Sequence, residues 1–173
     1  MKKILMNSTI IFIISTLIHS LYNYLPCFFT LIFVPINESI FEHLKMIFTS
    51  YMLFIILKYL FFNKKYNSKD IFIYFICGIL NIIIFLVMYL PIYYTFKEIL
   101  IVTLIIYFVS IVLSNILIER IANKNISKKA IIISKIGIVI VYIIFTLLSL
   151  YPLKVDFFFD PLNNKYGKYK LYS

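Results

Sequence analysis

The residues of this chain best suited to chemistry are concentrated in one short segment, residues 35–45, which reads P-I-N-E-S-I-F-E-H-L-K. It contains two of the seven acidic side chains and one of the two histidines, within a sequence that is otherwise strongly apolar. Carboxylates and imidazoles transfer protons and bind divalent metals. Because ionisable groups are costly near a bilayer, such a cluster is by default a candidate functional site.

Catalytic roles are predicted for the ionisable side chains of the segment, namely Glu38, Glu42, His43 and Lys45. Glu38 or Glu42 is expected to act as a general base, and Lys45 is expected to hold an anionic group of a substrate. On a helix, Glu38, Glu42 and Lys45 would share one face. The alternative interpretation is an ordinary helix start with an interfacial Glu42–Lys45 pair.

A metal-binding role is also predicted, with His19, His43 and Asp160 as ligands of a divalent metal such as zinc and with Glu38 and Glu42 as further candidate carboxylate ligands. Imidazole nitrogens and carboxylate oxygens form the ligand sets of catalytic zinc sites. The spacing matches no specific zinc motif such as H-E-x-x-H, so the cofactor itself stays open. The alternative for His19 is a single hydrogen bond between helices.

The rest of the chain must provide helices that position these side chains in a membrane. Of its 173 residues 63% are hydrophobic and only 14% are charged, whereas soluble domains are roughly 45–50% apolar. The apolar residues form runs long enough to cross a bilayer, which takes about 20 residues. We therefore predict an all-α polytopic membrane bundle that forms one integral membrane domain, residues 1–173.

Five transmembrane helices are predicted, at about residues 4–25, 41–62, 71–90, 99–118 and 130–151. Pro91 and Pro152 are expected to stop the third and fifth. Residues 26–36 are apolar but too short to cross, which favours an interfacial or re-entrant segment. Cys27 and Cys77 have no metal-type spacing, and both are expected to act as small apolar packing residues.

The charge distribution predicts an orientation. The formal net charge is +10, and most Lys and Arg residues fall at one set of span ends, which the positive-inside rule places in the cytoplasm. We therefore predict a plasma-membrane protein with a cytoplasmic N-terminus. Residues 152–173 would form an extracytoplasmic tail. The bilayer is the expected partner, nucleic acid is not, and no protein partner is identified. The segment 35–45, His19 and the tail would meet at the outer face.

The segment N-E-S-I-F-E-H-L-K, residues 37–45, resembles a motif of an uncharacterised family of small bacterial multi-pass membrane proteins. Members show V-N-E-S-[VI]-[WF]-E-H-L-K, an H-x-x-Y pattern that ends the first span, and a D-P-x-x-x-x-Y-G tail. This chain has Phe41 where Trp is usual and Asn163-Asn164 where a Thr-Gly turn is usual. Supporting roles are predicted for residues in these three motifs. Asn37 or Ser39 is expected to cap the second helix, and the other supporting residues are Tyr22, Pro161, Tyr166 and Gly167.

The resemblance implies no activity, so three hypotheses stay open. One is a membrane-embedded, metal-assisted hydrolase or transferase that acts on a lipid or envelope substrate. The alternatives are a small transporter or ion-coupled permease, and a non-catalytic accessory membrane protein. A transporter needs a polar path to the inner face, and an enzyme does not. The scarcity of polar residues in the predicted cytoplasmic halves favours the enzyme or the accessory protein.

Overall fold

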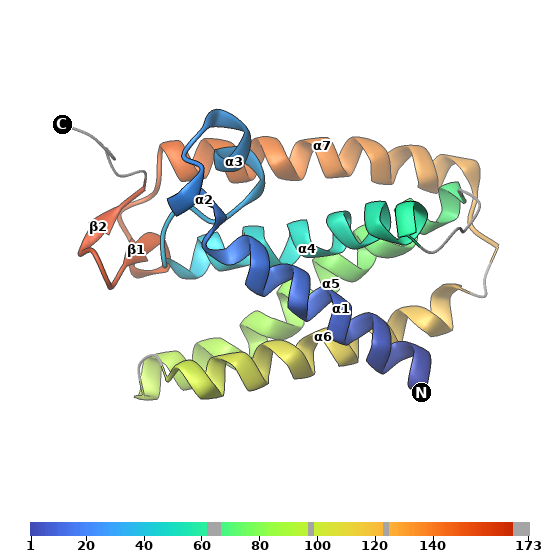
Figure 1. Ribbon diagram of the computed structural model, residues 1–173, viewed down its shortest axis with the longest axis horizontal. Helices are drawn as coiled ribbons and strands as arrows, with labels where there is room; N and C mark the ends of the chain where they lie inside the picture. Colours follow the sequence, from blue (N-terminus) through green and yellow to red (C-terminus); the bar gives the residue numbers. More distant parts are fainter. Residues whose placement is uncertain (62–66, 97–98, 123–124, 168–173) are drawn as a thin grey trace.

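Apolar runs of membrane-spanning length form helices because a helix satisfies all backbone hydrogen bonds within the segment. The computed structural model describes residues 1–61, 67–96, 99–122 and 125–167, and it is an all-α bundle with a small hairpin near the C-terminus (Figure 1). The helices are α1 (Lys2–His19), α2 (Leu21–Tyr24), α3 (Phe28–Phe33), α4 (Ile40–Phe61), α5 (Ser68–Phe96), α6 (Leu100–Ala122) and α7 (Lys128–Leu150).

Five of these segments are long and apolar enough to cross a membrane, at 18–29 residues each. They are α1 together with α2, then α4, α5, α6 and α7, which correspond to the five predicted spans. Outward-facing residues of α7 such as Ile133 and Val139 are 67% and 58% exposed, as expected for surfaces that contact lipid. The length and composition of these helices indicate a multi-pass membrane protein.

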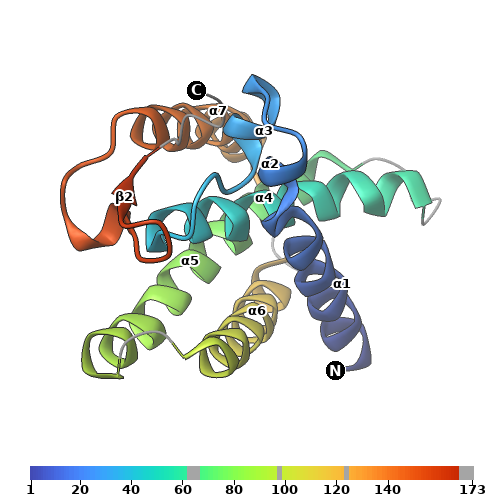
Figure 2. The ribbon, with the colours of Figure 1, turned by 60° about the vertical axis from the view of Figure 1, so that its left-hand side comes forward.

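Helix α4 is the centre of the bundle, with the other helices arranged around it (Figure 2). Its side chains Ile47, Phe48 and Tyr51 are fully buried. Gly78 of α5 lets α5 approach α4 closely, since a Cβ atom at Gly78 would lie 3.0 Å from the ring of Phe48. Most side chains of residues 37–45, at the start of α4, are buried as well, and Glu38 and His43 are half-buried.

The prediction that Pro91 stops the third span is wrong, because α5 continues through Pro91 to Phe96. Proline removes one backbone donor and crowds the preceding turn, but proline is tolerated within membrane helices, and further contacts stabilise the turn that follows Pro91. The hydroxyl of Thr95 donates to the Pro91 carbonyl at 2.7 Å. Tyr89 and Tyr93 also pack across this turn, with ring centroids 5.5 Å apart. Pro152 follows the end of α7 at Leu150, as predicted.

Helix α3 occupies the middle of the segment predicted to be interfacial or re-entrant. It is six residues long, too short to cross a membrane, and it lies beside α7 and α4 (Figure 1). Leu31 is buried, whereas Phe28 and Phe29 are 69% and 68% exposed. Cys77 is buried as expected, but Cys27, next to α3, is exposed and does not pack in the core.

The C-terminal tail folds back onto the start of α4. It contains a 3₁₀ turn, Asp156–Phe158, and an antiparallel hairpin of β1 (Phe159–Asp160) with β2 (Lys165–Tyr166). The ring of Phe158 packs on Phe41 with centroids 4.6 Å apart. The hairpin, α2 and α3 lie at one end of the bundle and the N-terminus at the other (Figure 1). The predicted convergence of three segments at one end is thus observed.

Candidate functional site

The helix start that carries the site is built by two short polar side chains. The Ser39 hydroxyl accepts a hydrogen bond from the Glu42 amide at 3.3 Å, which makes Ser39 the N-cap of α4. The Asn37 side chain accepts from the Ser39 amide at 2.9 Å and donates to the Gly167 carbonyl at 3.1 Å. The helix start, the loop before it and the tail are therefore held as one unit.

Two histidines and one glutamate meet at this end of the bundle. The Nε2 atom of His19 lies 3.2 Å from Oε2 of Glu38, and Nε2 of His43 lies 3.5 Å from the same oxygen. The two Nε2 atoms are 3.3 Å apart. The side chains of His19, Glu38 and His43 are 32%, 28% and 18% exposed. They come from the end of α1, the loop before α4 and the first turn of α4.

The hydrogen bonds of His43 determine which of its nitrogens is free to bind an ion. Its Nδ1 atom lies 2.9 Å from the Ser39 carbonyl oxygen, which can only accept. In the neutral ring, Nδ1 therefore carries the proton and Nε2 keeps its lone pair. A backbone carbonyl bonded to the other ring nitrogen is the usual way in which proteins orient a metal-binding histidine. The lone pair of His43 thus faces His19 and Glu38.

The three facing atoms form a triangle of the right size for a metal ion. A tetrahedral ion with bonds of about 2.0–2.1 Å separates its ligand atoms by about 3.3–3.4 Å. The observed separations are 3.2, 3.3 and 3.5 Å. Among the described residues, His19, Glu38 and His43 form the one group of three metal-ligating side chains that lies close enough together to hold an ion.

The charge on Glu38 suits the same role. Burial alone would raise the pKa of Glu38, but the hydrogen bond with His19 and the charges that the two imidazoles carry when protonated outweigh burial and lower the pKa below its usual value. The carboxylate is therefore ionised at neutral pH, as a metal ligand must be. Asp160, close by, acts against this shift.

Asp160 was predicted as a ligand, but the structure gives it a supporting position. Its carboxylate accepts from the amides of Leu162 at 2.8 Å and Asn163 at 3.2 Å, which closes the hairpin turn. It also accepts from the Glu38 amide at 3.3 Å. Asp160 is fully buried and is not part of the three-residue cluster. It fixes the backbone of Glu38, whose carboxylate is the one that lies beside the two imidazoles in that cluster.

Glu42 and Lys45 form a separate, buried ion pair. Lys45 Nζ lies 2.6 Å from Glu42 Oε2, and their side chains are 0% and 1% exposed. Lys45 also donates to the Leu31 carbonyl at 3.0 Å and to the Ser149 hydroxyl at 2.9 Å. The Ser149 hydroxyl donates to Oε1 of Glu42, and the Ile36 amide donates to Oε2, the oxygen that also contacts Lys45. The pair therefore joins α4 to α3, to the following loop and to α7.

This arrangement places Glu42 and Lys45 away from the cluster of His19, Glu38 and His43, and the general-base role of Glu42 and the anion-binding role of Lys45 stay predictions. The prediction placed both on one helical face with Glu38, but α4 begins at Ile40, so helical spacing does not extend to Glu38. Glu42 and His43, as neighbours on a helix, point about 100° apart. His43 faces His19 and Glu38, and Glu42 faces the interior.

The other predicted support residues lie around the tail and α2. Tyr22 is 3% exposed and Tyr166 is 38% exposed; the Tyr166 ring packs on Phe159 with centroids 5.2 Å apart. Pro161 is exposed at the hairpin turn. Gly167 is buried, with a φ of 70°, and it accepts the hydrogen bond from Asn37.

Replacing Gly167 by Ala is expected to loosen the tail. A non-glycine residue in this left-handed conformation costs about 1–2 kcal/mol, and a Cβ atom would lie 2.9 Å from Pro152 Cγ. Faster trypsin cleavage after the exposed Lys165 would report the change. Asn164→Gly is the matched control, because Asn164 has a φ of 53° that glycine adopts without strain. Equal cleavage of wild type and Gly167→Ala would contradict this expectation.

The fold and the site define a class of protein: a multi-pass helical membrane protein with a His/Glu cluster at one end of the bundle. The chain belongs to a family of unknown function, DUF6512, whose sequence model matches residues 1–168. This confirms the predicted membership of an uncharacterised membrane-protein family. No curated protein and no solved structure matches the chain.

Proposed function

We propose that the chain is a membrane-embedded, metal-dependent enzyme, a hydrolase or transferase that acts on a lipid or envelope substrate at the outer face of the plasma membrane. The observation that carries this proposal is the triangle of His19 Nε2, His43 Nε2 and Glu38 Oε2, with sides of 3.2–3.5 Å. Two imidazoles and one carboxylate are a ligand set of catalytic zinc sites, which keep the fourth position open for water or substrate.

The chemistry follows from that open position. Bound zinc lowers the pKa of a water ligand towards neutrality and polarises the oxygen of a substrate carbonyl or phosphoryl group. In hydrolysis, the water oxygen forms a bond to the carbonyl carbon or phosphorus, the bond to the leaving oxygen breaks, and that oxygen takes up a proton. Here His43, oriented by the Ser39 carbonyl, and Glu38, anchored by Asp160, would hold the ion in place.

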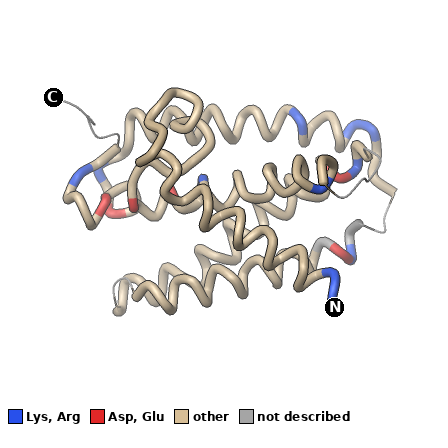
Figure 3. Tube along the Cα trace, in the orientation of Figure 1, with Lys and Arg blue, Asp and Glu red and all other residues tan. Residues whose placement is uncertain are grey.

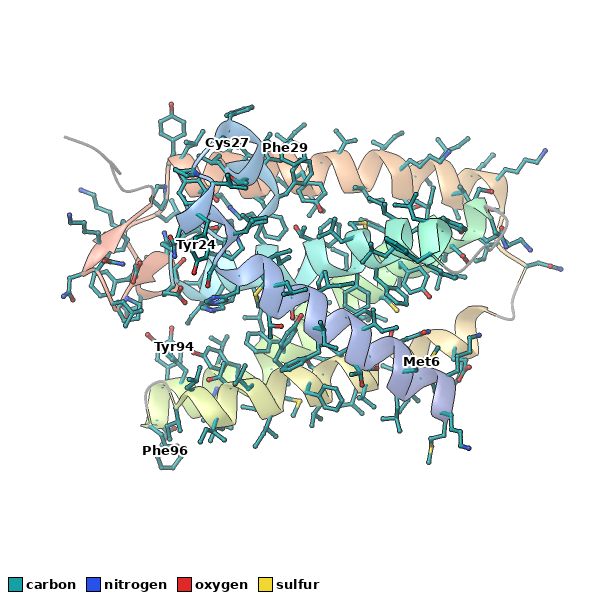
Figure 4. All side chains as sticks on the ribbon, in the orientation of Figure 1. Met6, Tyr24, Cys27, Phe29, Tyr94 and Phe96 are labelled. Atoms are coloured by element: carbon teal, nitrogen blue, oxygen red, sulfur yellow. The ribbon has the colours of Figure 1, made fainter. Side chains whose placement is uncertain are left out.

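The proposed orientation is supported by the distribution of charged and aromatic residues. Basic residues gather at the end of the bundle that carries the N-terminus (Figure 3), as expected for a cytoplasmic face. Tyr24, Tyr94 and Phe96 lie at the other end, opposite Met6 (Figure 4), and are 80%, 58% and 67% exposed. Exposed aromatic residues of this kind mark a membrane interface, and the His/Glu cluster lies at that same end.

A second candidate function, ion-coupled transport, is favoured by polar pairs inside the bundle. The hydroxyl oxygens of Ser50 and Tyr107 are 3.4 Å apart, and those of Tyr51 and Ser114 are 2.6 Å apart. Asn115 donates to Ser8 at 2.9 Å, nearer the N-terminal end. The first two pairs are not joined by any hydrogen bond between the described side chains. We place transport second because these groups satisfy one another instead of lining a path.

The proposed function is tested by hydrolysis assays on protein in detergent micelles. The protein is stripped with a chelator, reloaded with zinc, and offered para-nitrophenyl esters and phosphates that carry an alkyl chain. We expect release of nitrophenolate only from zinc-loaded wild type, with at least about 100-fold less from Glu38→Gln, because an altered ligand disrupts the centre. Zinc-loaded protein that hydrolyses none of these compounds, but takes up protons or cations in vesicles, would favour the transporter.

A further inference from the structure

A cavity of about 240 Å³ adjoins the metal-ligand cluster within the bundle. It is lined by His19, Glu38 and His43 at one side and by residues of α1, α4, α5 and α6 elsewhere. The other lining residues are Ser15, Thr16, Met46, Ile47, Phe85, Leu100, Thr103, Leu104 and Tyr107. A mostly apolar space therefore leads directly to the three side chains that would hold the metal.

The cavity has a buried wall and a side open to the lipid-facing surface. On the wall, Ile47, Phe85 and Tyr107 are 0%, 3% and 4% exposed. At the mouth, Leu100 and Leu104 of α6 are 66% and 39% exposed. The opening thus lies on the flank of the bundle, where hydrocarbon chains of the bilayer meet the protein.

The opening arises from the way α1 and α6 cross. Near the N-terminal end they are joined by the Asn115–Ser8 hydrogen bond of 2.9 Å and by Phe12, whose ring lies 5.6 Å from that of Phe108. Towards the other end, α1 leaves α6 on its way to α2 (Figure 1). The space between the diverging helices is the cavity.

The hydroxyl groups on the cavity wall already form hydrogen bonds within the protein. Ser15 donates to the Phe12 carbonyl at 2.7 Å, and Thr16 donates to the Ile13 carbonyl at 2.8 Å. Thr103 donates to the Ile99 carbonyl at 3.2 Å. Because these hydroxyls are satisfied by their own helices, the wall presents mainly carbon to an occupant. Polar recognition is left to the cluster of His19, Glu38 and His43.

We propose that this cavity binds the single hydrocarbon chain of an amphiphilic substrate, whose anionic or ester head group then lies at the metal centre. This inference rests on the proposed function and names its substrate class. The substrate would enter sideways from the bilayer between α1 and α6. The cavity is smaller than the roughly 300–1,000 Å³ of typical small-molecule pockets, which fits one chain better than the two chains of a diacyl lipid.

Photochemical labelling with a monoalkyl phosphate that carries a diazirine near the end of its chain tests the proposal. The zinc content of each sample is measured first. In zinc-loaded wild type we expect the label on Ile47, Phe85 and Tyr107, as mapped by mass spectrometry of peptides.

Two pairs of tryptophan variants on α6 supply the controls. Leu104 and Leu100 line the cavity. Their neighbours Ile105 and Ile101 do not line it, and these side chains are 58% and 70% exposed. We expect Leu104→Trp or Leu100→Trp to lower wall labelling at least about 10-fold, because the indole blocks the mouth. Wall labelling in Ile105→Trp and Ile101→Trp should stay within about twofold of wild type. All four variants should keep the zinc content of wild type.

The outcomes separate the two proposals. Wall labelling that is lost in the mouth variants and kept in their neighbours supports the cavity as the chain site. Zinc-loaded protein labelled only on outward-facing residues, or labelled equally in all variants, overturns the cavity proposal and leaves the metal centre standing. Wild type that binds no zinc overturns the proposed function, and with it the assignment of the head group.

Discussion

Replacement of His43 by Ala is expected to abolish stoichiometric zinc binding. The Nδ1 atom of His43 lies 2.9 Å from a backbone carbonyl oxygen, which leaves the lone pair of Nε2 available to an ion. Loss of a hydrogen-bond partner of a ligand already weakens metal binding about 10–100-fold, so loss of the ligand itself should weaken it by at least about 100-fold. Zinc titration against a competing chelator, on purified protein in detergent, measures the change.

Two further variants sharpen this expectation. His19→Ala should also lose stoichiometric zinc binding, because Nε2 of His19 lies 3.2 Å from Oε2 of Glu38 and 3.3 Å from Nε2 of His43. Asp156→Asn is the matched control, since it removes an exposed carboxylate at the same end of the bundle, outside the cluster. If His43→Ala and wild type bound zinc equally well, the ion would have to sit elsewhere.

Replacement of Lys45 by Met is expected to destabilise the protein by about 3–5 kcal/mol, because it leaves the buried charge of Glu42 without its partner. The Lys45–Glu42 distance is 2.6 Å and both side chains are almost wholly buried. The same substitution also removes the donors to the Leu31 carbonyl and to Ser149. Unfolding of detergent-solubilised protein by heat or by denaturing detergent measures the loss.

A second lysine in the chain provides a control for this variant. Lys58 also lies 2.6 Å from an acid, Asp70, but both side chains are 16% exposed, so solvent screens this partly buried pair more than it screens the Lys45–Glu42 pair. Lys58→Met should therefore be clearly milder than Lys45→Met. The double variant Glu42→Leu with Lys45→Met should recover part of the stability, since it removes both charges. Equal losses in Lys45→Met and Lys58→Met would show that burial of the pair is not the cause.

This stability effect changes how loss-of-function data should be interpreted. Variants of Glu42 or Lys45 would lose the proposed activity through misfolding, although neither residue belongs to the cluster of His19, Glu38 and His43. Activity of such variants is informative only when normalised to folded protein. Glu38→Gln is the better probe of chemistry, because the Glu38 side chain is 28% exposed and lies in the loop before α4.

The five spans could be predicted from the sequence because long apolar runs have one stable structure in a bilayer. The observed helices begin and end within a few residues of the predicted limits, except at α5. There the sequence shows Pro91, but it does not show that Thr95 and the Tyr89–Tyr93 contact stabilise the helix beyond it. Such compensation depends on side-chain packing, which residue types alone do not specify.

The candidate site could be located from the sequence, but its roles could not be assigned. Segment 35–45, His19 and the tail do meet at one end, as the spans and their order require. The different positions of Glu38, beside the imidazoles, and Glu42, in the interior, depend on where α4 begins, since Ser39 is its cap and Glu38 lies outside the helical turn. A difference of one or two residues at a helix start is beyond sequence reasoning.

The most direct test of the metal centre is X-ray absorption at the zinc edge of zinc-loaded wild type. The proposed centre predicts one zinc per chain, with nitrogen and oxygen ligands at about 2.0–2.1 Å, scattering from two imidazole rings, and no sulfur. A sulfur ligand at about 2.3 Å would place the ion on a cysteine such as the exposed Cys27. That result, or a folded wild type that binds no zinc, would contradict the assignment of His19, Glu38 and His43 as the metal site.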